Sequence, residues 1–90
     1  MKADNKQITR LLKTARGQLD GILKMVEDDR YCIDISNQLL ATQAILKKVN
    51  RSIIHSHIEH CVMEAYESGD PDNQREKLTE IDNILEKLMR

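Results

Sequence analysis

The sequence contains no phenylalanine and no tryptophan, and aromatic residues make up only 2% of its 90 residues. This excludes a core built around aromatic rings, and it excludes the aromatic platforms on which single-stranded nucleic acids stack. Apolar runs are two or three residues long, so no segment is predicted to form a transmembrane helix. The first residues do not show the pattern of a signal peptide, which is a positively charged segment followed by an apolar one. We therefore expect a cytoplasmic protein with a single domain over residues 1–90.

Neither sign of charge dominates, since the sequence has 14 Lys and Arg residues and 15 Asp and Glu residues, which gives a net charge of −1. Binding to nucleic acid or to an anionic membrane would therefore need a local patch. Only two cysteines occur, Cys32 and Cys61. In a reducing compartment they are better interpreted as metal ligands or redox-active thiols than as a disulfide. The sequence has no Gly-rich phosphate loop, nucleophile elbow or HExxH motif, and we do not expect an enzyme.

The spacing of the apolar residues predicts an all-α protein with three helices. Apolar residues recur every three or four positions along the first pattern, and the second pattern contains no proline or glycine. Gly69 and Pro71 end the second pattern, because glycine suits a helix C-terminus and proline cannot continue a helix. The predicted helices cover about 3–28, 32–67 and 74–89.

The predicted central helix is too long for a compact monomer. At 1.5 Å per residue it would span about 50 Å, more than the width of a compact domain of this size. Apolar residues form more than one stripe along it, so its own chain cannot cover every side. We therefore predict an obligate helical oligomer whose minimal unit is an antiparallel dimer.

A candidate metal site begins with His57 and Cys61, which are four residues apart and therefore share one helix face. Cys32 lies 25 residues before His57, or about 37 Å along a straight helix, and cannot reach the same ion within one chain. In an antiparallel dimer, Cys32 of one protomer would meet His57 and Cys61 of its partner. Two thiolates and one imidazole form a soft, three-coordinate set that favours copper(I).

Two other interpretations of these residues stay open. The two thiols could react with each other or with sulfane sulfur across the interface, as in a redox or persulfide sensor. Alternatively, Cys32 and Cys61 are ordinary small buried residues and His57 is a surface histidine.

Charge is segregated along the chain. Residues 1–24 carry six cations and two anions, and a second basic cluster lies near the middle of the long helix. Together they could form a basic stripe suited to duplex DNA phosphates, although charged faces are usually just solvated. The candidate DNA-binding cations are Arg10, Lys13, Arg16, Lys47, Lys48 and Arg51.

Four short motifs give the chain a family resemblance. They are Arg16-Gly17-Gln18, Arg30-Tyr31-Cys32, His57-x3-Cys61 and Ser68-Gly69-Asp70. In this combination the chain resembles the copper-sensing operon repressor family, whose relatives sense nickel, formaldehyde and persulfides. The order of Cys, His and Cys is typical of the copper(I) branch, whereas the nickel branch ends in His and the persulfide branch lacks the middle His.

The resemblance implies a disc-shaped tetramer of two dimers that binds operator DNA without metal and releases it when copper(I) binds. It implies that Cys32, His57 and Cys61 are the ligands. Tyr31 and Glu80 would then hydrogen-bond the histidine. Gln18 joins the cations as an expected DNA-binding residue.

The chain departs from the family pattern at Leu11 and Thr14, where basic residues are usual, and carries its charge on neighbouring positions instead. A repressor that senses persulfides through Cys32 and Cys61 is therefore kept as the alternative. A copper-buffering protein without DNA binding and a purely structural oligomer are further rivals.

Overall fold

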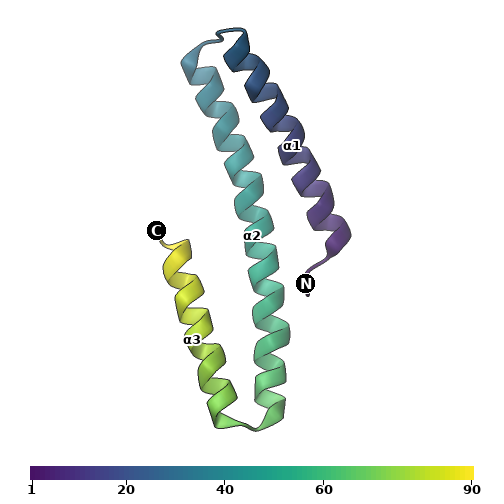
Figure 1. Cartoon of the computed structure of the whole chain (residues 1–90), viewed down its shortest axis with the longest axis vertical. Helices are drawn as coiled ribbons and strands as arrows, with labels where there is room; N and C mark the ends of the chain where they lie inside the picture. The colour runs from purple at the N-terminus through teal and green to yellow at the C-terminus, as the bar shows by residue number, and fades with distance from the viewer. The chain divides into compact units, whose positions relative to one another are not determined.

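The computed structural model describes residues 1–90 as three helices joined by two short connections, with a few non-helical residues at each end (Figure 1). This confirms the predicted all-α class and the long central helix. None of the helices has the length and apolar content needed to cross a membrane. The helices are α1 (Asn5–Glu27), α2 (Cys32–Ser68) and α3 (Pro71–Leu88).

Short polar residues fix the helix ends. Asp4 caps α1, because its Oδ1 accepts hydrogen bonds from the backbone N–H groups of Lys6 and Gln7 at 3.1 and 3.3 Å. Gly69, with φ of +67°, follows the last residue of α2 in the left-handed conformation that glycine adopts without strain. The predicted stop of the central helix at this glycine is therefore confirmed.

The third helix begins at Pro71, earlier than the predicted start near residue 74. Pro71 occupies the first turn, where its missing N–H costs nothing and its fixed φ suits the helix. Asp70 caps the same end, with Oδ1 accepting a hydrogen bond from Asp72 N at 3.0 Å. The proline that ends one helix pattern thus also begins the next helix.

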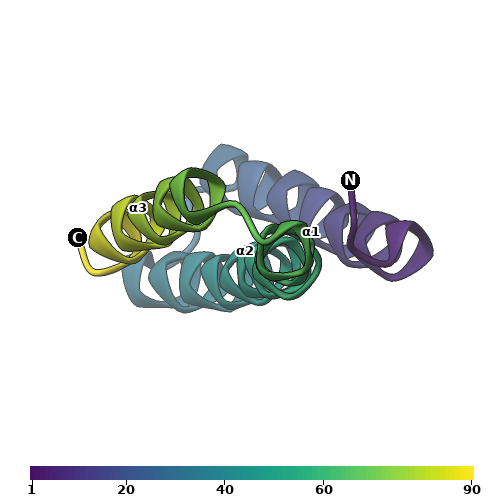
Figure 2. The same cartoon turned by 90° about the horizontal axis from the view of Figure 1, so that it is seen from below.

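The chain divides into two compact units. In the first, essentially residues 3–53, α1 runs beside the first part of α2 as a helical hairpin (Figure 1). In the second, essentially residues 54–90, α3 lies beside the remainder of α2, as Figure 2 also shows.

The first unit has a narrow core with heptad spacing. Ile8, Ala15 and Ile22 on α1 are buried and seven residues apart, and so are Thr42 and Val49 on α2. This spacing suits two helices packed at a shallow angle along one seam. Many large apolar side chains outside the seam remain exposed, among them Leu23, Leu40 and Leu46.

Candidate metal site and nucleic-acid interface

The predicted pair on α2 forms the centre of the candidate metal site. Cys61 Sγ lies 3.4 Å from His57 Nδ1, and both residues are half-buried. The contact follows from helix geometry, because residues four apart lie one turn from each other on the same face. The structure thus brings together two of the three predicted ligands.

A carboxylate from α3 orients the imidazole. His57 Nε2 contacts Glu80 Oε1, so the two ring nitrogens face side chains of different helices. An ionised carboxylate only accepts hydrogen bonds, so Nε2 is the donor. In the neutral ring, Nδ1 then presents its lone pair toward Cys61. The predicted contact between Glu80 and the histidine is present in this structure.

The surroundings of Glu80 stabilise the ionised form of its carboxyl group. The hydrogen bond from His57 lowers the pKa of this carboxyl most, and the positive charge of Lys77 lowers it further. These contributions outweigh partial desolvation, which acts in the opposite direction. Glu80 is therefore ionised at neutral pH and accepts a hydrogen bond from the Nε2–H group of His57.

The contact between Cys61 and His57 fits a small soft cation. Bonds of the length found in zinc sites, about 2.3 Å to sulfur and about 2.0 Å to nitrogen, would separate the two donors by about 3.3 to 3.7 Å at angles of about 100° to 120°. The observed 3.4 Å lies in this range. Within one chain, however, no group of three or more His, Cys, Asp or Glu side chains could hold a metal ion.

The remaining predicted residues of the metal site are in the other unit. Cys32 is the first residue of α2, with an exposed side chain, and Tyr31 precedes it and is also exposed. Both cysteines are free thiols. These two predicted site residues therefore belong to a different unit from His57, Cys61 and Glu80.

Lys77 is a site residue that the sequence reasoning missed. Its Nζ lies 3.5 Å from Glu80 Oε2, the oxygen that does not face the histidine. The signal was available, because Lys77 and Glu80 are three residues apart on a predicted helix and therefore share a face.

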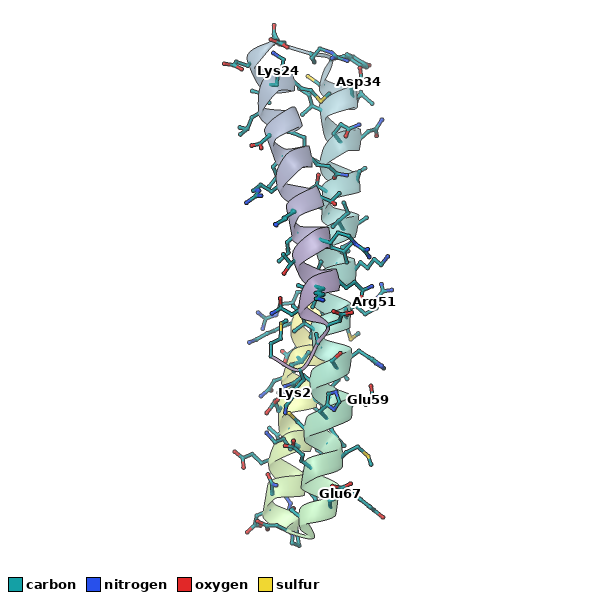
Figure 3. The ribbon with its side chains drawn as sticks, turned by 90° about the vertical axis from the view of Figure 1, so that its right-hand side faces the viewer. Lys2, Lys24, Asp34, Arg51, Glu59 and Glu67 are labelled. Atoms are coloured by element: carbon teal, nitrogen blue, oxygen red, sulfur yellow. The ribbon has the colours of Figure 1, made fainter.

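The candidate DNA-binding cations all belong to the first unit. Arg10, Lys13 and Arg16 are exposed on α1, and Lys47, Lys48 and Arg51 are exposed on α2. Figure 3 shows Arg51 extending away from its helix. None of the six forms an ion pair within the chain, so their charges are free for an external anion.

The structure places Gln18 differently from these cations. It is half-buried, and its Oε1 accepts a hydrogen bond from the buried Thr42 hydroxyl at 2.7 Å. Its side-chain oxygen therefore connects α1 to α2 inside the hairpin.

Known proteins with similar sequences are copper sensors by name. The chain is 44% identical over 75 residues to the copper-sensing transcriptional repressor CsoR of Bacillus subtilis, covering 83% of this chain and 74% of that protein. It is 50% identical over 58 residues to CsoR of Mycobacterium ulcerans, covering 64% of this chain and 50% of that protein. The chain thus spans about half the length of this mycobacterial relative.

Solved structures share the fold. The copper-sensing repressor CsoR with Cu(I) from Geobacillus thermodenitrificans has a TM-score of 0.84 and 36% identity, with 94% of this chain and 85% of that chain covered. The nickel-responsive transcriptional regulator InrS has a TM-score of 0.82 and 24% identity, covering 97% of this chain and 94% of its own, and supports the fold alone. Residues 4–87 match the family model described as metal-sensitive transcriptional repressor, and the chain therefore belongs to this family.

Proposed function

We propose that this protein is a transcriptional repressor that binds operator DNA in its metal-free form and is released by copper(I). The observation that carries the proposal is the orientation of His57, whose Nδ1 faces Cys61 and whose Nε2 is held by Glu80. Outer hydrogen bonds of this kind fix the tautomer and the direction of a histidine that binds metal. An ordinary surface histidine needs no such arrangement.

The third ligand is proposed to come from a second chain. One helix, α2, carries Cys32 at its start and Cys61 near its end. Antiparallel packing of two such helices places the start of one beside the end of the other, which gives two equivalent sites per dimer. The exposed Leu39, Leu40 and Leu46 on α2 support this arrangement, because a second chain would remove their apolar surface from water.

The donor set favours copper(I) over other metals. Two thiolates and one imidazole are soft ligands, and a closed zinc site would need a fourth donor. When bound, copper(I) would supply a link between two chains. The copper-sensing names of the relatives from Bacillus subtilis and Geobacillus thermodenitrificans support the same choice.

The histidine offers a route from the site to the rest of the oligomer. Its ring contacts Cys61 on α2 through one nitrogen and Glu80 on α3 through the other. A change in the imidazole position is therefore transmitted to α3 by a direct contact. We propose that the resulting change in helix packing lowers the affinity of the six exposed cations for DNA. The assembly proposed for this response is a disc-shaped tetramer of two dimers.

A titration of DNA with and without copper(I) tests the proposed function. Duplexes are first selected from a random library with metal-free protein, and affinity is then measured anaerobically. Coupling of about 1 to 3 kcal/mol corresponds to a loss of about 5- to 150-fold when copper(I) is added. Cys61→Ala should bind DNA as the wild type does but show no loss with copper(I). Equal affinities of the wild-type protein with and without copper(I) would contradict the proposal.

The persulfide and copper-buffering alternatives have less support. A sensor that cross-links Cys32 and Cys61 through sulfur needs no imidazole beside the thiol, whereas His57 lies 3.4 Å from Cys61. A copper buffer needs no basic surface, whereas six exposed cations have no partner within the chain. Mass spectrometry after exposure to a persulfide donor separates the sulfur alternative, because only that sensor forms di- to tetrasulfide links between chains.

A further inference from the structure

The carboxylate that holds His57 has a second partner on its own helix. Glu80 Oε1 contacts His57 Nε2, and Lys77 Nζ lies 3.5 Å from Glu80 Oε2. One carboxylate oxygen of Glu80 thus contacts His57 on α2, and the other contacts Lys77 on α3 itself. Lys77, Glu80 and His57 form a chain of contacts that ends at the candidate metal ligand.

Packing restricts the position of Lys77. Its side chain is 29% exposed, whereas Lys2, Lys24 and Arg90, the other Lys and Arg residues in ion pairs, are 55%, 75% and 74% exposed. Lys77 lines a groove of about 200 Å³ between α2 and α3. The groove is lined by Val62, Ala65, Tyr66, Gln74, Lys77 and Leu78. A lysine can lay its stem along an apolar surface while its ammonium group stays in a polar environment, and here the ammonium group lies beside Glu80.

The contact between Lys77 and Glu80 also affects the orientation of the His57 ring. With only one partner, the Glu80 carboxylate could rotate about its terminal bond, because such torsions are broad. The Lys77 ammonium group at Oε2 limits this rotation and keeps Oε1 directed toward Nε2. The orientation of the imidazole, and with it the direction of Nδ1, therefore depends on a residue that touches neither the histidine nor Cys61.

We propose that Lys77 is a positioning residue for the metal site, which holds Glu80 so that His57 keeps its proton on Nε2 and its Nδ1 toward Cys61. The role of this arrangement in copper(I) binding rests on the proposed function. The arrangement itself belongs to the metal-free protein and can be measured there.

The first test is nitrogen NMR of the histidine rings in metal-free, full-length protein. In the wild type the His57 ring should be almost entirely the Nε2–H tautomer. Lys77→Met keeps an unbranched apolar stem but removes the charge, and it should shift the ring toward a mixture of tautomers. Lys77→Arg should restore the wild-type spectrum, and Lys87→Met, which changes an exposed lysine on the same helix, should leave it unaltered.

The second test is a double-mutant cycle on copper(I) affinity, measured against a competing chelator. Loss of an outer partner typically costs about 10- to 100-fold in metal affinity, and Lys77→Met should cost about 10-fold because it acts through Glu80. In a Glu80→Gln background, Lys77→Met should cause no further loss.

Either of two results would overturn the role of Lys77: an unchanged His57 tautomer in Lys77→Met, or an equal loss of copper(I) affinity in both backgrounds. Absence of copper(I) binding by the wild-type protein would instead contradict the proposed function, and the tautomer comparison would still decide the role of Lys77. Circular dichroism of each variant establishes that the helices are retained.

Discussion

At the scale of single residues, His57 is distinguished from the other histidines by its partners. Its two ring nitrogens contact Cys61 and Glu80, whereas the exposed His55 pairs with Glu59 at 3.5 Å on the same helix. Both histidines occur on the same stretch of α2, so the difference comes from the face each one occupies.

We expect His57→Ala to lower copper(I) affinity by at least about 10- to 100-fold, because it removes one of the proposed ligands. His55→Ala is the matched control and should bind as the wild type does. Both are measured anaerobically by competition with a copper(I) chelator. Equal affinities of the two variants would exclude His57 as a ligand.

Gly69 is a second residue with a specific physical role. Its φ of +67° lies in the left-handed region, which costs an ordinary L-residue about 1 to 2 kcal/mol. We expect Gly69→Ala to lower the free energy of unfolding by about 1 to 2 kcal/mol, measured by urea denaturation. Gly69→Asn should cost less, because asparagine tolerates this conformation. Equal stability of wild type and Gly69→Ala would contradict this account of the turn.

At the scale of helices, the hairpin of α1 and α2 depends on a narrow heptad seam. Ile22 is 7% exposed and belongs to this seam, whereas the neighbouring Lys24 is exposed. We expect Ile22→Ala to destabilise the protein by about 2 to 5 kcal/mol, the usual cost of truncating a buried isoleucine. Lys24→Ala should change stability by less than about 0.5 kcal/mol. Thermal unfolding of both variants measures the difference. Similar melting temperatures would contradict the claim that the heptad seam stabilises the hairpin.

Much of the helix content is predictable because it depends on local spacing. Apolar residues three and four apart predict all three helices, and Gly69 predicts the end of α2. The predicted start of α3 near residue 74 is too late, because proline suits the first turn of a helix as well as ending the one before it.

Contacts between helices were less predictable than the helices. His57 and Cys61 are four apart, so helix geometry alone brings them together. The hydrogen bond between Gln18 and Thr42 joins residues 24 apart and depends on the register of the hairpin, which no local spacing encodes. The contact of Glu80 with His57 was expected from family resemblance and not from the spacing of the residues.

At the scale of the whole molecule, the candidate DNA-binding cations and the candidate metal ligands His57 and Cys61 belong to different units. The six candidate cations lie in residues 10–51 of the first unit, and His57, Cys61 and Glu80 lie in the second. A change at the metal site therefore needs coupling through the helices or through partner chains to affect DNA binding.

We expect Lys13→Gln to weaken DNA binding about equally for all sequences and to reduce the salt slope of the binding constant by about 1, as expected for one lost phosphate contact. Lys87→Gln on α3 is the control and should leave the slope unchanged. Fluorescence anisotropy at several salt concentrations measures both variants. An unchanged slope in Lys13→Gln would show that Lys13 makes no contact with a DNA phosphate.

The central claim is that each metal site is shared between two chains. The most direct test mixes two variants that each lack a complete copper(I) site. Cys32→Ala and Cys61→Ala should each lack tight copper(I) sites. In a mixed antiparallel dimer, Cys32 of one protomer would meet His57 and Cys61 of the other, which restores one intact site. The two variants are mixed under conditions that allow exchange of chains and titrated with copper(I) against a chelator. We predict about one tight copper(I) ion per four chains after random exchange. If the mixture binds no more copper(I) than the two variants alone, the shared site is contradicted.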